Sequence, residues 1–298
     1  MVMGITKSIN EIISKDCEIR KINDQPFVFL EGPVWDKKNQ RLYFTDPLDL
    51  KIICMNDDET FSVVHDNSGY ANGMCINKEG NLIICKMDTG SIDEIEPRSG
   101  MHLSVVAQGY QGKPFNATND VICDEKGGYY ITDPFFTYGP QKQELEATYY
   151  HSAEGKTIRV ATDSKKPNGL ALSPDGKCLY IDDTGSINVW KYEVKQDGTL
   201  KQGEIFCKIY PPQDISDLPP VQHFGEADGM KVDSAGNVYI TTYTGIQIFN
   251  QIGEYLGKIE MPGTESAANL VFGGRDLKTL YITARTSLYA IDVLIPGY

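Results

Sequence analysis

Apolar and polar residues alternate with a period of two along most of the chain, and turn-forming runs such as DEKGG and SPDGK interrupt the alternation. This alternation places every second side chain on one face of a strand, and the abundant Tyr, Ile, Val and Thr residues favour strands. Two such segments joined by a tight turn predict a β-hairpin. No segment repeats with the 3.6-residue spacing of an α-helical repeat, so the pattern predicts an all-β protein.

One hairpin pattern occurs six times. Each copy has a polar residue, a short apolar strand, a turn and a second strand: EGPVWDKKNQRLYFTD from Glu31, NGMCINKEGNLIICK from Asn72, NDVICDEKGGYYITD from Asn119, NGLALSPDGKCLYIDD from Asn168, DGMKVDSAGNVYITT from Asp228 and NLVFGGRDLKTLYITA from Asn269. The starting residues are 41, 47, 49, 60 and 41 positions apart, and further strand-like segments follow the hairpins. Four short strands in about 40–50 residues are typical of a propeller blade. The sequence therefore predicts a six-bladed β-propeller with four antiparallel strands per blade.

The sixth repeat ends one strand short, after SLYAIDVL. The strand-like segment EIRKI, from Glu18 to Ile22, is not used by the six repeats and can supply the missing strand. Its pairing into the last blade would close the ring and remove two exposed edges. We therefore expect a single domain over residues 1–298, closed by an N-terminal strand. Residues 1–15 would form an extension that is a short helix or is loosely held.

The six starting positions of the repeats carry only Glu, Asp or Asn. In a propeller the first strand of each blade lines the central channel, so these side chains converge on one axis. The turn preferences of Asn-Gly and Asp-Gly account for two or three of the six residues, but not for Glu31, which precedes Gly-Pro. Burial of so many oxygen-bearing side chains is unfavourable unless a cation binds among them. The pattern therefore predicts a metal site in the channel.

The residue types indicate which ion would bind. No His or Cys occupies the six positions, and the four histidines show no ligand spacing, which disfavours zinc, copper and haem sites. Carboxylate and amide oxygens suit Ca²⁺ better than Mg²⁺. Glu31 and Asp228 would neutralise a divalent charge and leave positions open for water or substrate. We expect a divalent ion, first of all Ca²⁺, with Zn²⁺, Mg²⁺ and Mn²⁺ as the alternatives.

A second set of acidic residues ends the second strand of three repeats: Asp46, Asp133 and Asp183. We expect these carboxylates to bind backbone amides and to hold neighbouring blades together. Asp120, directly after Asn119, also differs from the other early repeats, which have Gly at that position.

Two stretches interrupt the repeat pattern: residues 134–148, after the second strand of repeat three, and residues 208–224, before repeat five. Because the two strands of a hairpin are antiparallel, both stretches should emerge at the mouth where the six polar residues lie. They form either passive surface loops or a wall over the site.

The 28 basic and 41 acidic side chains give a formal net charge of −13 and a pI near 4.8. Nucleic-acid binding needs clustered Lys and Arg, so this charge balance argues against it. No apolar run approaches the roughly 18 residues of a membrane span, and the N-terminus lacks the apolar core of a secretory signal. Seven cysteines without CxxC spacing predict buried thiols in a reducing compartment. We expect a cytoplasmic protein that acts on a small molecule as a monomer or weak dimer.

Five segments resemble the gluconolactonase/regucalcin (senescence marker protein) family, and its bacterial gluconolactonase branch in particular. They are EGPVW, NATNDV with YYITDP, KPNGLALSPDGKCLYIDDT, ADGMKVDSAGNVY and VFGGRDLKTLYITARTSLY. The similarity runs from about residue 27 to the C-terminus. It implies a six-bladed propeller, Ca²⁺ or a similar ion in the channel, and hydrolysis of sugar lactones.

The resemblance also implies roles for individual residues. Glu31, Asn168 and Asp228 match the metal ligands of the family, and Asp228 is also its candidate general base. Asn119 matches the residue that contacts the substrate or completes the metal shell.

Two positions depart from the family pattern. Animal members carry an Arg two residues before the third-blade Asn, where it holds the sugar, and this chain has Ala117. Many bacterial members carry Glu-His after a second-blade Cys, where this chain has Lys86 and Met87 after Cys85. The resemblance therefore implies an intact metal site with a changed substrate wall.

The expected chemistry follows from a metal ion beside a carboxylate. The ion would polarise the lactone carbonyl as a Lewis acid, and Asp228 would accept a proton from the attacking water. Asn119 would donate a hydrogen bond to the developing oxyanion. The aromatic residues of the insertions can pack on the apolar face of a sugar ring, and the candidate substrate contacts are Asn72, Asn116, Asn119, Phe136 and Tyr138.

Other enzyme classes lack their signatures, since the chain has no GxSxG elbow, no P-loop and no dinucleotide fingerprint. Two alternatives to lactone hydrolysis stay open. One is hydrolysis of a phosphoester or fluorophosphate, as in the related diisopropyl-fluorophosphatase propellers. The other is a non-catalytic propeller that binds a ligand or a protein.

Overall fold

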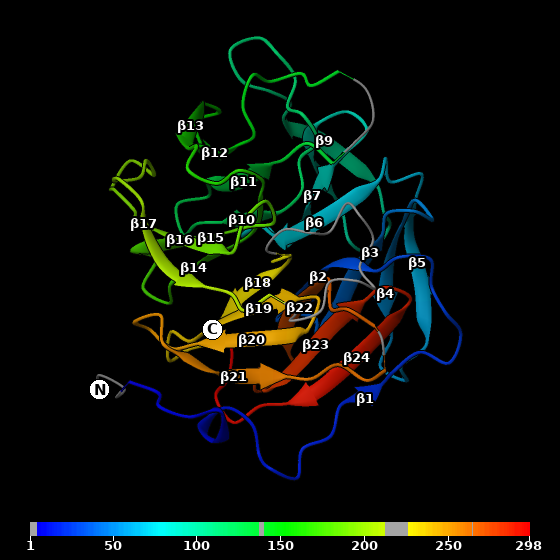
Figure 1. The fold of residues 1–298 in the computed structure, drawn as a ribbon. Helices are drawn as coiled ribbons and strands as arrows, with labels where there is room; N and C mark the ends of the chain where they lie inside the picture. The colour runs from blue at the N-terminus through cyan, green and yellow to red at the C-terminus, as the bar shows by residue number, and fades with distance from the viewer. Residues whose placement is uncertain (1–4, 137–139, 212–225, 264) are drawn as a thin grey trace.

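The computed structural model describes residues 5–136, 140–211, 226–263 and 265–298. Within these ranges the chain forms six four-stranded antiparallel sheets that are arranged as a ring (Figure 1). The predicted six-bladed β-propeller is therefore confirmed. In the described ranges, no helix has the length and apolar character needed to cross a membrane.

Each of the first five blades uses four consecutive strands. Blades one to three contain β2 (Glu31–Asp36), β3 (Arg41–Asp46), β4 (Lys51–Met55) and β5 (Phe61–Asp66); β6 (Ala71–Ile76), β7 (Leu82–Lys86), β8 (Ser91–Ile95) and β9 (His102–Ala107); and β10 (Val121–Cys123), β11 (Tyr129–Asp133), β12 (Ala147–His151) and β13 (Thr157–Ala161). Blades four and five contain β14 (Pro167–Leu172), β15 (Cys178–Asp183), β16 (Asn188–Glu193) and β17 (Glu204–Lys208); and β18 (Met230–Val232), β19 (Val238–Thr242), β20 (Gly245–Phe249) and β21 (Tyr255–Ile259). Blade six contains β22 (Asn269–Gly273), β23 (Thr279–Ala284), β24 (Ser287–Asp292) and, as its fourth strand, β1 (Arg20–Lys21).

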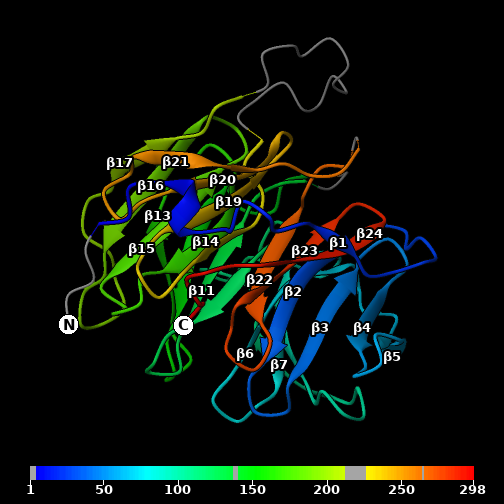
Figure 2. The same ribbon diagram turned by 90° about the horizontal axis from the view of Figure 1, so that it is seen from below.

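The first strands of the blades surround the channel. Each contacts the first strand of the next blade, in the order β2, β6, β10, β14, β18, β22 and back to β2. Because the strand order repeats from blade to blade, all six begin at one mouth of the channel and end at the other. In Figure 2 the turns that follow these strands gather at the lower edge of the ring.

The N-terminal strand closes the ring as predicted. Within β1, Arg20 pairs with Ala290 and Lys21 pairs with Tyr289 of β24. The amide of the next residue, Ile22, donates a hydrogen bond of 2.8 Å to the carbonyl of Leu288. This short pairing covers the outer edge that blade six would otherwise expose.

The chain before β1 is also attached to the propeller. A short 3₁₀ helix, η1 (Ile9–Glu11), is followed by Ile12, whose side chain is fully buried in the cluster between blades five and six. The carbonyl of Ile12 accepts a hydrogen bond of 2.7 Å from the amide of Leu294. Of the two expectations for this extension, the short helix is observed, and Ile12 anchors it.

Apolar side chains fill the spaces between adjacent blades, while a row of buried threonines links them by hydrogen bonds. Thr132 Oγ1 donates to the carbonyl of Asn168 in the next blade (2.7 Å) and accepts the amide of Asp120 in its own blade (3.0 Å). Thr241 makes the same pair of contacts, donating to the carbonyl of Ala268 (2.7 Å) and accepting the amide of Gly229 (2.7 Å). In these two blades one hydroxyl therefore ties the start of the first strand to the following blade.

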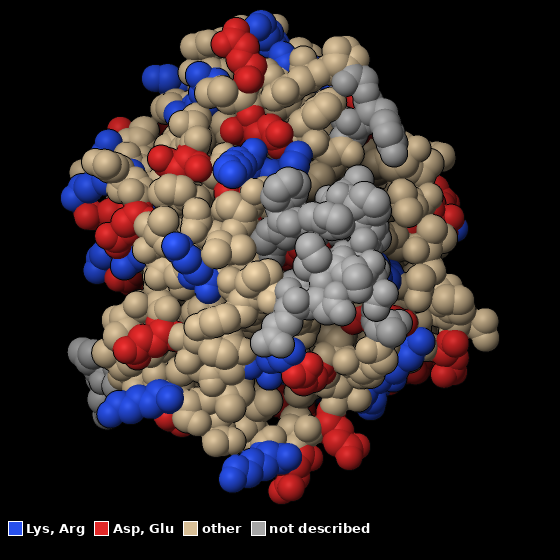
Figure 3. Space-filling view, viewed as in Figure 1, with Lys and Arg blue, Asp and Glu red and all other residues tan. Residues whose placement is uncertain are grey.

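The surface carries charges of both signs. On the face seen in Figure 1, the basic and acidic side chains are interspersed rather than separated (Figure 3). All seven cysteines are free, and four of them are buried, which agrees with the expectation from their spacing.

Candidate active site

The six predicted site residues lie at the mouth where the first strands begin. Glu31 and Asn269 open β2 and β22, Asn72 and Asn168 are the second residues of β6 and β14, and Asn119 and Asp228 stand two residues before β10 and β18. Five of these side chains are buried, and Asp228 is partly accessible. The repeat pattern therefore brings together the set that the sequence analysis selected.

The glycine that follows most of these residues is required by close packing. A Cβ atom on Gly169 would lie 2.3 Å from the carbonyl oxygen of Asp228 in the next blade, and Gly169 donates its amide to that oxygen at 2.8 Å. The backbone dihedral φ of Gly169 is not positive, so the turn preference considered for Asn-Gly does not explain it. The glycines allow neighbouring blades to approach at the channel wall.

Two asparagine side chains bind the two carboxylates of the ring. Asn168 Nδ2 donates to Asp228 Oδ1 at 2.9 Å, and Asn269 Nδ2 lies 3.3 Å from Glu31 Oε2. The same Asn168 nitrogen also donates to Thr184 Oγ1 at 3.0 Å, which fixes the orientation of the amide. With its nitrogen used in this way, Asn168 keeps its oxygen as an acceptor or metal ligand.

The carboxylates of the ring are held at raised pKa values. Burial raises the pKa of Glu31 well above its ordinary value, and the nearby charge of Asp228 raises it further. Burial also raises the pKa of Asp228 to about 7, against the hydrogen bond from Asn168, which lowers it. Two carboxylates that destabilise each other's charged form are suited to a cation.

Two further buried aspartates lie close to the ring and were not assigned to the site from sequence. Burial raises the pKa of Asp120 and that of Asp182, and the charge of Asp228 raises the pKa of Asp182 further. Among the described residues, Oδ2 of each has no hydrogen-bond partner. Asp182 occupies the position where four other blades have Thr, a signal in the repeat that could have identified it.

Arg285, in the turn after β23, brings a positive charge to the same mouth. Its charge lowers the pKa of Asp228 and that of Glu226. Burial has the larger effect on Glu226 and raises its pKa to about 7. Its Nε donates to Ser266 Oγ at 2.8 Å, and its guanidinium lies 5.4 Å from the centre of the Phe29 ring. No local pattern in the sequence marks Arg285, because its position depends on the closure of the ring.

The side chains at this mouth fit a divalent cation. In the described part of the chain, no group of three or more His, Cys, Asp or Glu residues forms a cluster that could ligate a metal ion. The donors would instead be mixed, with two carboxylates from Glu31 and Asp228 and an amide oxygen from Asn168. Such a set suits Ca²⁺, which accepts carboxylate and amide oxygens together. Burial raises the pKa of both carboxylates, so a bound cation would stabilise their charged forms.

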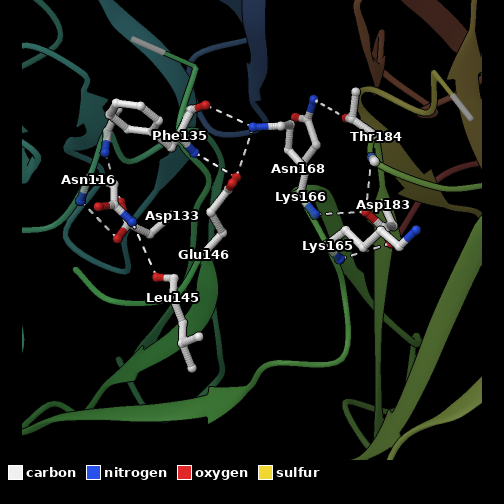
Figure 4. A network of polar contacts seen from close by, with 12 residues as sticks. Asn116, Asp133, Phe135, Leu145, Glu146, Lys165, Lys166, Asn168, Asp183 and Thr184 are labelled. Atoms are coloured by element: carbon white, nitrogen blue, oxygen red, sulfur yellow. Dashed lines mark hydrogen bonds and ion pairs between the residues drawn. The ribbon is translucent and has the colours of Figure 1, made fainter. Parts of the chain in front are cut away.

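One wall of the mouth is built from the first insertion and the segment that enters blade four (Figure 4). Lys166 Nζ contacts Glu146 Oε2 at 3.0 Å and the carbonyl of Phe135 at 2.8 Å. The same ammonium lies 4.7 Å from the centre of the Phe136 ring, and Phe136 is 40% exposed. Lys166 stands two residues before Asn168 of blade four. Ala117 stands at the equivalent position of blade three, two residues before Asn119.

The other predicted substrate contacts have different surroundings. Asn116 is buried, and its Oδ1 accepts the amides of Lys142 and Gln143, so its side chain braces the first insertion. Asn72 Nδ2 lies 3.6 Å from the sulfur of Met87. Tyr138 lies outside the described residues, as does most of the second insertion.

Asp46, Asp133 and Asp183 bind backbone amides as expected. Asp133 accepts the amides of Asn116 and Ala117, both at 2.9 Å, and the other two bind pairs of amides in the same way. In each case the amides belong to the segment that enters the blade from the preceding one. These carboxylates therefore fix the entry of the first strand just before its site residue.

Lys86, at the second departure, pairs through its backbone with Ala71 beside Asn72, but its side chain contacts residues outside the ring. Its ammonium lies 3.6 Å from Oδ2 of the buried Asp93, which His102 Nε2 also contacts at 2.9 Å. These residues line a groove beside blade two.

Comparisons with known proteins identify the family of the chain and agree with the propeller fold. The family described as SMP-30/gluconolactonase/LRE-like region matches residues 29–286. A gluconolactonase from Zymomonas mobilis is 31% identical over 280 residues, which cover 85% of this chain and 75% of that protein. A pentonolactonase from Haloferax volcanii is 28% identical, with 85% and 80% covered. The solved structure of a gluconolactonase from Xanthomonas campestris has a TM-score of 0.84 and 26% identity, and the match covers 97% of this chain and 94% of that one.

Proposed function

The chain belongs to the SMP-30/gluconolactonase/LRE-like family, and from this premise we propose that it is a metal-dependent lactonase that opens sugar lactones. The observation that carries the proposal is the convergence of Glu31, Asn168 and Asp228 at one mouth of the channel. Their oxygen atoms, the raised pKa values of the carboxylates and the direct contact between Asn168 and Asp228 fit a divalent ion that faces a small substrate.

We infer that Glu31, Asn168 and Asp228 hold the ion, with Asn119 in or beside its shell and Ca²⁺ as the first candidate. When bound, the ion would supply Lewis-acid polarisation of the lactone carbonyl. The regucalcin of Xenopus laevis, 25% identical to this chain, also belongs among the matched proteins.

The residues of the chain supply the remaining steps. Asp228 accepts a proton from the attacking water, as the water oxygen forms a bond to the carbonyl carbon. Asn119 donates an amide hydrogen to the oxyanion that develops on the carbonyl oxygen. Cleavage of the acyl–oxygen bond of the ring then releases the ring oxygen, which takes up a proton, and the product is a hydroxy acid.

The substrate wall would be formed by the first insertion and the mouth of blades three and four. Phe136 offers an apolar ring face, and the Lys166 ammonium beside it offers a donor for sugar hydroxyls. Arg285 adds a second fixed positive charge at the mouth. We keep Asn72 and Tyr138 as predicted contacts, while Asn116 would act by holding the insertion in place.

Metal analysis of variants tests the ligand assignment. Glu31→Gln and Asp228→Asn should each lose most of the bound ion, because a neutral amide replaces a charged ligand. The matched control is Asp93→Asn, which changes a buried carboxylate away from the channel. This variant should keep the bound ion. Full occupancy in both site variants would refute the assignment.

A substrate panel tests the activity. We expect turnover of glucono-δ-lactone or a pentonolactone by the metal-loaded protein. Turnover of a fluorophosphate in preference to every lactone would contradict the proposed substrate class, and the absence of any turnover would favour a binding protein.

A further inference from the structure

The channel has a second opening whose chemistry differs from that of the site. A cavity of about 790 Å³ is lined by the ends of the first strands and by the turns that follow them. Glu31 opens β2 at the site mouth, whereas Trp35 and Asp36 at the end of the same strand line this cavity. Five residues of strand separate the two openings by roughly 16 Å. We call the cavity at this second opening the turn-side cavity.

The turns of the first four blades each bring lysine to the rim of this cavity. Lys37 and Lys38 follow β2, Lys78 follows β6, Lys126 follows β10, and Lys177 precedes β15. These turns lie together because the six first strands run in the same direction (Figure 2). The propeller topology therefore collects lysines that are about 40–50 residues apart in the sequence.

Two more lysines complete the set. Lys195 comes from the turn between β16 and β17 and also lines the cavity. Lys231, the second residue of β18, lines the cavity from the channel wall. Its Nζ donates to the carbonyl of Met230 at 2.9 Å, and its charge lowers the pKa of Asp120.

The balance of charge in the turn-side cavity is opposite to that of the protein. The lining contains seven lysines and five acidic residues, whereas the whole chain has 28 basic and 41 acidic side chains. Clustered charge of one sign raises the local concentration of ions of the other sign. The cavity is therefore a basic site in an acidic molecule.

Several of the acidic side chains there are already used by the turns. Asp36 accepts the amides of Lys38 and Asn39, and Asp124 accepts the amides of Lys126 and Gly128. By contrast, within the described residues the ammonium groups of Lys37, Lys38 and Lys195 have no hydrogen-bond or ion-pair partner within bonding distance. Lys177 and Lys78 lie 3.1 and 3.8 Å from Asp175 and Glu79, and Lys126 donates to the carbonyl of Gln196. The three unpaired lysines and Lys231, which has no carboxylate partner among the described residues, are therefore the charges most available to a ligand.

The walls between the lysines are partly aromatic, with Trp35, Tyr130 and Phe272 among the lining residues. A volume of several hundred cubic ångströms with apolar walls and a few charged groups is typical of a small-molecule site. Cations on several sides suit a ligand with more than one negative charge.

We propose that the turn-side cavity binds a small organic anion that carries several carboxylate or phosphate groups, held by the rim lysines and by Lys231. The site is separate from the lactone chemistry at the opposite mouth and does not depend on it.

Calorimetric titration of metal-free, desalted protein at low ionic strength tests the proposal, with citrate as the carboxylate probe and pyrophosphate as the phosphate probe. We expect one saturable site for at least one probe, and the probe that binds identifies the group recognised. The combined variant Lys38→Gln, Lys126→Gln, Lys231→Gln should weaken binding by roughly tenfold or more.

Two controls separate a built site from general electrostatics. The variant Lys15→Gln, Lys21→Gln, Lys208→Gln has the same change in net charge outside the cavity and should bind as the unmodified protein does. Glu31→Gln should also bind normally, whether or not the lactonase proposal holds. Absence of saturable binding by both probes, an equal loss in the charge-matched variant, or loss in Glu31→Gln would overturn the proposal.

Discussion

At the scale of single residues, the repeat pattern identified the ring because six equivalent positions carry only oxygen-bearing side chains. It did not identify Asp182, which stands next to Asp183. In a strand, adjacent side chains point to opposite faces, so Asp183 binds the entry segment of its blade while Asp182 binds the amide of Gly169 in the first strand. Two adjacent aspartates therefore have different roles that composition alone does not separate.

Substitution of Asp182 by Thr should stabilise the metal-free protein. Asp182 Oδ1 accepts the amide of Gly169 at 3.0 Å, as Thr241 accepts the amide of Gly229, but Asp182 Oδ2 has no partner among the described residues. A threonine hydroxyl can keep that acceptor and donate to the next blade. We expect Asp182→Thr to raise the free energy of unfolding at pH 8 by about 1–2 kcal/mol, measured by urea titration.

The matched control for this prediction is Thr132→Val, which removes the same kind of bridging hydroxyl. It should lower the free energy of unfolding by about 1–2 kcal/mol. If Asp182→Thr instead destabilises the protein as much as Thr132→Val does, the carboxylate of Asp182 has a stabilising partner and the prediction is wrong.

The stability of the metal-free protein should fall as pH rises. Burial raises the pKa of Asp228 to about 7, so the native state binds the proton more tightly than the unfolded state, whose Asp has a pKa near 4. The stabilisation is complete below the unfolded pKa and is lost as pH rises through about 7, by on the order of 4 kcal/mol in all, of which roughly 3 kcal/mol is lost between pH 5 and pH 8. Urea unfolding at pH 5 and pH 8 after chelation measures the difference.

Two comparisons check that prediction. Asp228→Asn should reduce the pH dependence between 5 and 8 by the share of Asp228, leaving the share of the other buried carboxylates, Glu31 and Glu226 among them. Saturating Ca²⁺ should reverse the sign in the unmodified protein, because the ion binds the deprotonated carboxylates of the folded state. A metal-free protein that is more stable at pH 8 than at pH 5 would contradict the assignment of these pKa values.

At the scale of elements, the period of the hairpins predicted both the number of blades and the strand that closes the ring. The attachment of the N-terminal extension could not be predicted, because Ile12 packs against blades five and six, more than 200 residues away along the chain. No local pattern around Ile12 distinguishes a docked segment from a loose one. The conformation of the extension is therefore determined by its packing on blades five and six rather than by its local sequence.

Truncation of Ile12 should reveal this attachment. The side chain is fully buried, so we expect Ile12→Ala to lower the free energy of unfolding by about 2–4 kcal/mol through lost burial and the cavity that remains. Asn10→Ala, an exposed neighbour, should change it by less than about 0.5 kcal/mol. Equal stability of the two variants would show that the extension does not dock in solution.

The first insertion should influence which lactone is accepted. Phe136 is exposed, and its ring packs on the Lys166 ammonium beside the segment that leads to Asn168. We expect Phe136→Ala to change the ratio of kcat/KM between glucono-δ-lactone and a pentonolactone by roughly threefold to tenfold at unchanged metal content.

The control for the insertion is Leu103→Ala, which removes an exposed apolar side chain from the outer strand β9. It should leave the ratio unchanged. A common decrease for both lactones in Phe136→Ala, or a change in stability alone, would show that the insertion is a structural loop.

At the scale of the whole molecule, the sequence predicted a ring of blades with a polar mouth, because both follow from one repeated pattern. Features that depend on several blades at once were not predictable. Arg285 reaches the site through closure of the ring, and the lysines of the turn-side cavity come from separate turns that only the propeller brings together. Each repeat therefore specifies the fold of its own blade, whereas the side chains that meet at the two ends of the channel depend on the closed ring of six blades.

The central claim, metal-dependent lactone opening at the mouth of Glu31, Asn168 and Asp228, is tested most directly by one measurement. It is the rate of proton release from glucono-δ-lactone by protein that has been stripped of metal, verified by elemental analysis, and then supplied with Ca²⁺ again. We predict that removal lowers kcat/KM by at least about 100-fold, that Ca²⁺ restores it, and that Asp228→Asn stays inactive with Ca²⁺ present. An unchanged rate in verified metal-free protein would contradict the account.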